Sequence, residues 1–199
     1  MRRRYLKKAG EVFLAVVLAS QLLHADDVTE SISDALEQYK EGAYSDAIES
    51  LEYATQIIRQ KKANTLEAYL PQALEGWQAA ENKQQAGAAA LFGGGVSSSR
   101  TYHRGASSVT VTIAADSPVL QSMMMLFSNP AFATADGGTM EKIKRQKAIV
   151  TYSEPQKSGD IKIVVKKRFF VTVEGRDVSK EELVAYAEAI EYTKLAKLQ

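Results

Sequence analysis

The sequence predicts an α+β fold: an N-terminal helical hairpin, then a mainly antiparallel β-sheet with an inserted helix and a C-terminal helix. Up to Ile58, apolar residues recur every three or four positions, as they do along a helix face. From Val96 onward they alternate with polar residues, which is typical of half-buried strands. The predicted organisation is a signal peptide over 1–25, a helical part over 26–92 and an α+β sheet domain over 93–199.

The first twenty-five residues have the order of a secretory signal peptide. A cationic start, 2–8, precedes an apolar run, 12–18, and a small residue, Ala25, marks the expected cleavage point. The apolar run is shorter than the about 20 residues that cross a membrane. The mature chain is therefore expected to be periplasmic or secreted, with no transmembrane span. The arginines at 2–4 also resemble a twin-arginine motif, so both export routes stay open, with general secretion favoured.

Residues 26–58 predict two helices separated at Gly42. In the second, Ala47, Leu51, Ala54 and Ile58 lie along one helix face. The positions that match a repeat pattern are Ala35, Tyr39, Gly42, Tyr44, Ala47, Leu51 and Ala54. This segment resembles one tetratricopeptide hairpin, in which small residues let the helices approach closely, although Arg59 stands where that pattern expects a closing proline. Such hairpins seldom bury their apolar face alone, so we expect this one to pack on the rest of the chain or on another protein.

The next segment joins the helical part to the sheet. Trp77, the only tryptophan, is expected to fill the core at this junction. The Ala- and Gln-rich segment from Gln78 to Phe92 predicts a further helix, and 93–95, three glycines, predicts its end.

Alternation predicts the strands of the sheet. Ser99–Arg104 and Ser107–Ile113 form a hairpin around Gly105, and three more strands are centred on the alternating residues Ala148/Val150/Tyr152, Ile161/Ile163/Val165 and Phe169/Val171/Val173. A helix is expected from Ser117-Pro118 to the residue before Asn129, and a loop from Ala131 to Gly138. Ser179 and Glu182 form a capping box for the last helix, whose predicted buried residues are Leu183, Tyr186, Ala187 and Ile190.

Several short sequence segments together suggest a family. They are Leu70-Pro71 with Gly76-Trp77, Phe92 with 93–95, Asp116-Ser117-Pro118, and the terminal unit of strand, Gly175, Ser179 and helix. The layout resembles a family of small exported, periplasmic α+β proteins with one tetratricopeptide-like hairpin, for which no activity is known. The resemblance therefore implies a fold and a location and no chemistry.

Composition excludes several site types. The chain has no cysteine, which excludes disulfides, lipid attachment at a cysteine and thiolate metal sites. Residues 26–92 contain twelve acidic and five basic residues, whereas 140–168 contain nine basic and three acidic. The two charged parts either dock on each other or face a partner. Export makes nucleic acid an unsuitable partner.

Candidate catalytic and metal-binding residues are few. After cleavage His103 is the only histidine, so a Ser-His-Asp site has to use it, and the candidate serines, 97–99, lie only a few residues away on the same strand or loop. One histidine without cysteine offers no ligand set for a metal, and no cofactor is expected. Met123–Met125 cannot converge on one Cu(I) ion because adjacent helical residues point about 100° apart. The glycines at 93–95 lack the lysine of a phosphate loop.

The remaining candidates are basic. Arg100, Tyr102 and Arg104 share one strand face by the period of two, and Lys142 and Lys144 are expected to share another. A basic face with an aromatic suits phosphate groups, while an ordinary solvated face is the simpler interpretation.

Because the sequence offers few candidate catalytic or metal-binding residues, we expect a non-catalytic exported accessory or binding protein that acts through another protein of the cell envelope. The alternatives are a carrier of a small apolar or amphipathic ligand between the sheet and the Met-rich helix, and a hydrolase using His103.

Overall fold

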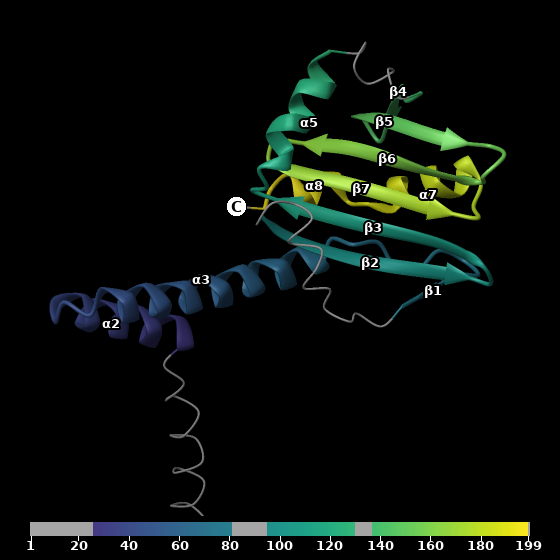
Figure 1. Ribbon diagram of the computed structural model, residues 1–199. Coiled ribbons are helices and arrows are strands. Elements are labelled where there is room, and N and C mark those ends of the chain that lie inside the picture. Colours follow the sequence, from purple (N-terminus) through teal and green to yellow (C-terminus); the bar gives the residue numbers. More distant parts are fainter. Residues whose placement is uncertain (1–25, 81–94, 130–136, 199) are drawn as a thin grey trace, which may run out of the picture. The chain divides into compact units, whose positions relative to one another are not determined.

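The computed structural model describes residues 26–80, 95–129 and 137–198 (Figure 1). The predicted signal peptide lies outside these residues, as do most of the predicted 78–92 helix and of the predicted 131–138 loop. The chain divides into two compact units between Gln60 and Lys61. The division predicted at 92/93 falls in the undescribed stretch, and residues 61–80 belong with the sheet. Among the described residues, no helix combines the length and apolar character needed to cross a membrane.

The first unit is the helical hairpin. Helix α2 (Asp27–Lys40) and helix α3 (Tyr44–Glu67, which ends in the second unit) are joined by a short turn at Gly42, whose φ of 80° favours glycine. Ala35, Ala47 and Ala54 are buried, so small residues of both helices lie on the inner side of the hairpin. Helix α3 continues past Arg59, where the repeat pattern expects proline, because no residue there interrupts its hydrogen bonds.

The second unit is built on a seven-stranded antiparallel sheet in the order β1-β2-β3-β7-β6-β5-β4, which confirms the predicted α+β class. The strands are β1 (Gln78–Ala79), β2 (Val96–Arg104), β3 (Ser107–Ala115), β4 (Thr139–Ile143), β5 (Gln146–Ser153), β6 (Ser158–Val165) and β7 (Phe169–Arg176). The helices are α5 (Val119–Ser128), α7 (Lys180–Ala189) and α8 (Tyr192–Leu195). In Figure 1, α7 and α8 lie behind the sheet and α5 lies on its other side.

The alternation of the strands creates two unlike faces. One face carries Val111, Ile163, Val173 and their neighbours, and it packs on Leu183 and Tyr186 of α7 together with Trp77 to form the main core. This confirms the predicted roles of Trp77 and of the α7 residues. On the other face a small cluster of Ala114, Leu120 and Phe170 packs beneath α5, and the rest of that face, called here the open face, is polar.

Three expectations about local structure are wrong. Gln78 and Ala79 form strand β1 instead of starting a helix, because their backbone pairs with His103 and Tyr102 of β2. Lys144 lies in the β4–β5 turn with a φ of 42°, so it does not share a strand face with Lys142. The C-terminal segment also forms the short helix α8 after Ile190, where α7 ends in an extended residue.

Candidate functional site

Large apolar side chains are exposed along one side of the hairpin. They are Ile32, Leu36, Tyr39, Tyr44, Ile48, Leu51 and Ile58, each between 47% and 63% exposed. On α2 the spacing is four and three residues, and on α3 the first three have the same spacing, so each set forms one stripe of its helix. The rings of Tyr39 and Tyr44, whose centroids are 5.6 Å apart, join the two stripes across the turn. We call these seven residues the apolar face.

The large apolar side chains are left exposed because small side chains fill the contact between the two helices. Val28, Ala35, Ala47 and Ala54 fill the contact between α2 and α3. Leu51 and Ile58, which lie next to the alanines around the helix, are therefore left about half exposed. Soluble chains rarely expose a contiguous apolar patch of this extent without a binding role.

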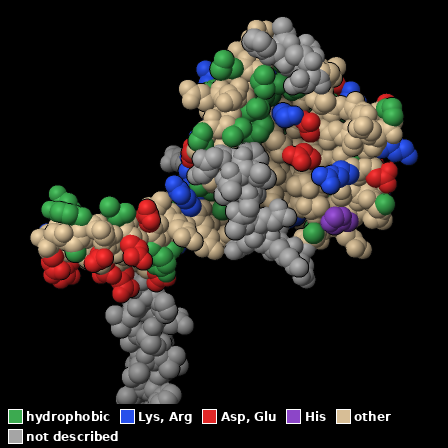
Figure 2. All heavy atoms as spheres, viewed as in Figure 1, with side chains coloured by type: hydrophobic (Ala, Val, Ile, Leu, Met, Phe, Trp, Pro, Cys, Tyr) green, Lys and Arg blue, Asp and Glu red, His purple; other side chains and the backbone are tan. Residues whose placement is uncertain are grey.

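The opposite side of the hairpin is acidic. A groove there is lined by Asp27, Glu30, Ser31, Asp34, Gln38, Asp46, Glu49, Ser50 and Tyr53. Across it, the Ser50 hydroxyl donates a hydrogen bond to the side-chain oxygen of Gln38, at 2.9 Å. In Figure 2 most of the red side chains of this unit lie along its lower edge, while green side chains stand out along its upper edge. The negative charge of the helical part is thus concentrated away from the apolar face.

Arg100, Tyr102 and Arg104, the binding candidates from the sequence, do share one face of β2. That face is the covered one. Tyr102 is fully buried and its hydroxyl donates to the carbonyl of Pro71. Arg100 lies 3.1 Å from the Glu67 carboxylate, so the guanidinium that would bind a phosphate is already neutralised.

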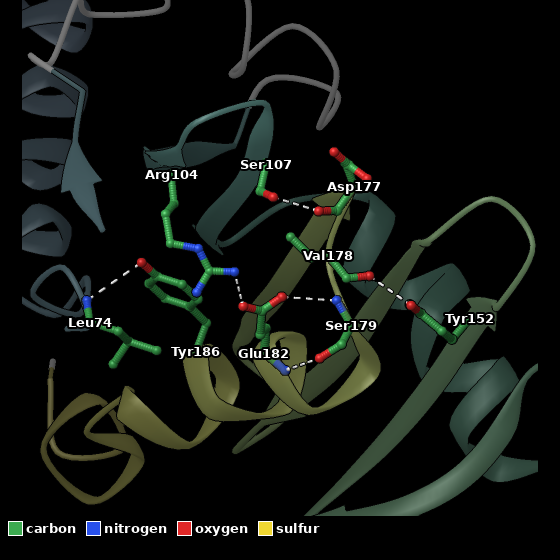
Figure 3. A network of polar contacts seen from close by, with 9 residues as sticks. All are labelled: Leu74, Arg104, Ser107, Tyr152, Asp177, Val178, Ser179, Glu182 and Tyr186. Atoms are coloured by element: carbon green, nitrogen blue, oxygen red, sulfur yellow. Dashed lines mark hydrogen bonds and ion pairs between the residues drawn. The ribbon is translucent and has the colours of Figure 1, made fainter. Parts of the chain in front are cut away.

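Arg104 belongs to a polar network at the start of α7 (Figure 3). Its guanidinium stacks over Trp77, with 4.6 Å to the ring centroid, and forms an ion pair with Glu182. Glu182 also accepts from the backbone N–H of Ser179 at 2.9 Å, completing the predicted capping box. The three candidate residues therefore hold α7 and the 67–77 segment on the sheet.

Two buried tyrosines adjoin this network. Tyr102 and Tyr186 lie with ring centroids 4.6 Å apart. Burial raises the pKa of each phenol to about 12. Both hydroxyls therefore stay protonated at any physiological pH and act as hydrogen-bonding groups.

His103 lies on the open face and is exposed; it is the purple residue in Figure 2. Ser99 is four residues away along the same extended strand, which places it about 13 Å off and out of reach for proton transfer. Within the described ranges no group of three His, Asp or Glu side chains is placed to hold a metal ion. Met123 packs on the cluster under α5 whereas Met125 is 67% exposed, so the methionines point in different directions as expected.

The open face carries a shallow groove that the sequence does not single out. It is lined by Thr101, Ser108, Thr110, Ser158, Gly159, Asp160, Lys162, Thr172, Glu174, Gly175 and Arg176. The Thr172 hydroxyl is buried and has no hydrogen-bond partner. Two residues further along β7 and β6 stand Phe170 and Val164, which belong to the apolar cluster under α5. The groove is thus hydroxyl-rich and charged, and it borders an apolar patch.

Basic turns gather at one end of the sheet. Lys144 and Arg145 connect β4 to β5, and Lys166 and Lys167 connect β6 to β7; all four have positive φ. Antiparallel pairing puts these two turns at the same sheet end. Much of the basic excess of 140–168 is therefore exposed at turn tips.

Comparison with known protein families, with characterised proteins and with solved structures found no match.

Proposed function

We propose that this chain is an exported, non-catalytic binding protein whose helical hairpin docks a protein partner through the apolar face. The observation that carries the proposal is the exposure of seven large apolar side chains on a hairpin whose own helix–helix contact is already filled by alanines. Burial of such side chains stabilises a complex by about 25 cal/mol per Å² of apolar surface, before the costs of association. The hairpin therefore has a surface suited to a partner's apolar helix or groove.

Export is proposed from residues 1–25, whose cationic start, apolar run and Ala25 have the order of a signal peptide. Fractionation of expressing cells, with the amino terminus of the purified chain defined by mass spectrometry, tests this part. A periplasmic or secreted chain that begins near Asp26 is expected. A cytosolic chain with an intact Met1 would contradict it.

The docking proposal is tested by crosslinking and capture from envelope extracts. Leu36→Glu places a charge in the apolar face at a position already 54% exposed, so the fold should be kept. Tyr39→Ser and Tyr53→Ser form a matched pair, since both tyrosines are exposed but only Tyr39 lies in the apolar face. Capture should fail with Leu36→Glu, weaken with Tyr39→Ser and persist with Tyr53→Ser. A partner that all four chains capture equally would refute docking at this face.

A second candidate function is carriage of a single-chain amphiphile, and the groove on the open face favours it. The unpartnered Thr172 hydroxyl, with Glu174 and the Lys162–Asp160 ion pair beside it, suits a polar head group, and the patch around Phe170 suits an acyl chain. Native mass spectrometry of the freshly purified chain, followed by titration with lysophosphatidylethanolamine, tests it. Thr172→Val should weaken binding whereas the exposed Thr193→Val should not. Absence of any co-purifying mass and of binding in the titration would discard the carrier.

A further inference from the structure

Among the described residues of the other unit, no surface corresponds to the apolar face. All but one of the large apolar side chains that are exposed in the described residues belong to the hairpin, and the exception is Met125 of α5. Apolar docking needs apolar surface on both sides, because a polar surface would lose its hydration without replacement hydrogen bonds. Within the described parts of the chain, the surface that best matches an apolar face is the apolar face of another hairpin.

The area fits a stable dimer. Seven side chains, each about half exposed, with roughly 200 Å² apiece when fully accessible, give on the order of 700 Å² per copy. Two such faces bury about 1,400 Å² in total, which is within the usual range for specific protein–protein interfaces.

The charges fit as well. The acidic groove lies on the other side of the hairpin, so two copies that meet by their apolar faces keep Asp34, Asp46 and the other carboxylates in solvent. Beside the apolar face, Glu52 and Arg59 line a hollow on α3 together with Ile48 and Leu51. In a two-fold arrangement each contact between unlike residues forms twice, so opposite charges at the rim of the face can pair across the axis.

We propose that the apolar face binds the same face of a second copy, forming a four-helix, two-fold symmetric dimer. This inference rests on the proposed docking function and names its partner. In a four-helix bundle formed by two hairpins, each hairpin buries the apolar stripes that the other leaves exposed.

Sedimentation equilibrium of the full-length chain over a wide concentration range tests the dimer, with the amino terminus defined by mass spectrometry and helix content by circular dichroism. The wild-type chain should be a dimer. Leu36→Glu should weaken association by at least about 100-fold, because a central charge would have to be buried unpaired. Tyr53→Ser should dimerise like the wild type, and Tyr39→Ser more weakly.

The remaining outcomes distinguish failure of the dimer from failure of the docking function. A wild-type chain that stays monomeric overturns the second-copy inference, including the case in which a retained 1–25 segment covers the face within one chain. A dimer that persists in Leu36→Glu also overturns it, since the interface then lies elsewhere. If the monomeric chain still captures a different protein, and Leu36→Glu abolishes that capture, the docking function stands without the dimer. Failure of both self-association and capture ends both proposals.

Discussion

Replacing Glu182 by alanine tests how α7 is held on the sheet. The Glu182 carboxylate accepts from the Ser179 N–H at 2.9 Å and forms an ion pair with Arg104 (Figure 3). The Arg104 guanidinium in turn lies over the Trp77 ring. The other half of the capping box, from the Glu182 N–H to the Ser179 hydroxyl, uses the backbone of position 182 and survives the substitution. Glu182→Ala therefore removes two defined contacts and leaves the helix start otherwise unchanged.

The expected loss follows from these two contacts. A side-chain cap contributes about 1 kcal/mol to stability. The Glu182 side chain is 25% exposed and Arg104 is 45% exposed, so solvent screens their ion pair and it contributes at most about 1 kcal/mol. The unfolding free energy of the sheet unit should fall by about 1–2 kcal/mol in Glu182→Ala. Glu182→Gln retains an oxygen that accepts from Ser179, so it should lose about half as much or less.

Urea unfolding followed by the fluorescence of Trp77 measures the effect, because this single tryptophan is buried beside Tyr186 and reports on the core beneath α7. Glu188→Ala, an exposed position of the same helix, serves as the control and should be nearly neutral. The reasoning is refuted if Glu182→Ala unfolds like the wild type, or if the glutamine variant is as destabilised as the alanine variant.

Three further predictions concern the sheet unit. Burial raises the pKa of Tyr102 from 10.0 to about 12. Above pH 10 the phenol therefore loses its proton in the unfolded chain before it does in the folded chain, and the free energy of unfolding should fall with pH up to about pH 12. Urea unfolding of Tyr102→Phe at several pH values should show a smaller decrease of this free energy with pH. The hydrogen bond from Lys62 lowers the pKa of Asp116 below its ordinary 3.8. The stability from this pair is therefore complete above pH 3.8 and is lost as pH falls through the lower folded-state pKa, and Asp116→Asn should flatten that part of an acid titration. Replacing Lys166-Lys167, whose φ values are 53° and 54°, by Asn-Gly should raise the thermal midpoint and add about 1 kcal/mol of stability, because asparagine and glycine adopt positive φ more readily than lysine. An unchanged midpoint would contradict this reasoning.

The strands that the sequence predicts are those with one covered and one open face. On β3, Val109 and Val111 face the core while Ser108 and Thr110 face the groove, and this contrast is what alternation detects. Strand β4 is expected only from the shared face assigned to Lys142 and Lys144, and its bounds are not predicted, because Thr-Met-Glu-Lys-Ile includes only two apolar side chains. Strand β1 was missed because two residues form it, and its backbone partners lie more than twenty residues away in β2.

Periodicity placed Arg100, Tyr102 and Arg104 on one face but could not say which face was covered. The answer depends on register, since Tyr102 pairs with the buried Val109. The partners that neutralise the arginines, Glu67 and Glu182, come from helices at opposite ends of the sheet unit's sequence. A count of basic residues along one strand cannot reveal such pairs. The open-face groove escaped prediction for a related reason, because its hydroxyls and charges come from four strands.

The hairpin shows where helical periodicity stops being informative about function. Ala47, Leu51, Ala54 and Ile58 have the spacing of a single buried stripe, yet the two alanines are buried while Leu51 and Ile58 are about half exposed. The apolar stripe is wider than the surface that one helix–helix contact buries. Alanines allow the helices to approach closely, so the contact buries only the part of the stripe that the alanines occupy. In repeat proteins the remaining width is buried by the neighbouring repeat. In the dimer proposed above, the apolar face of a second copy covers this unused width and leaves the acidic sides in water.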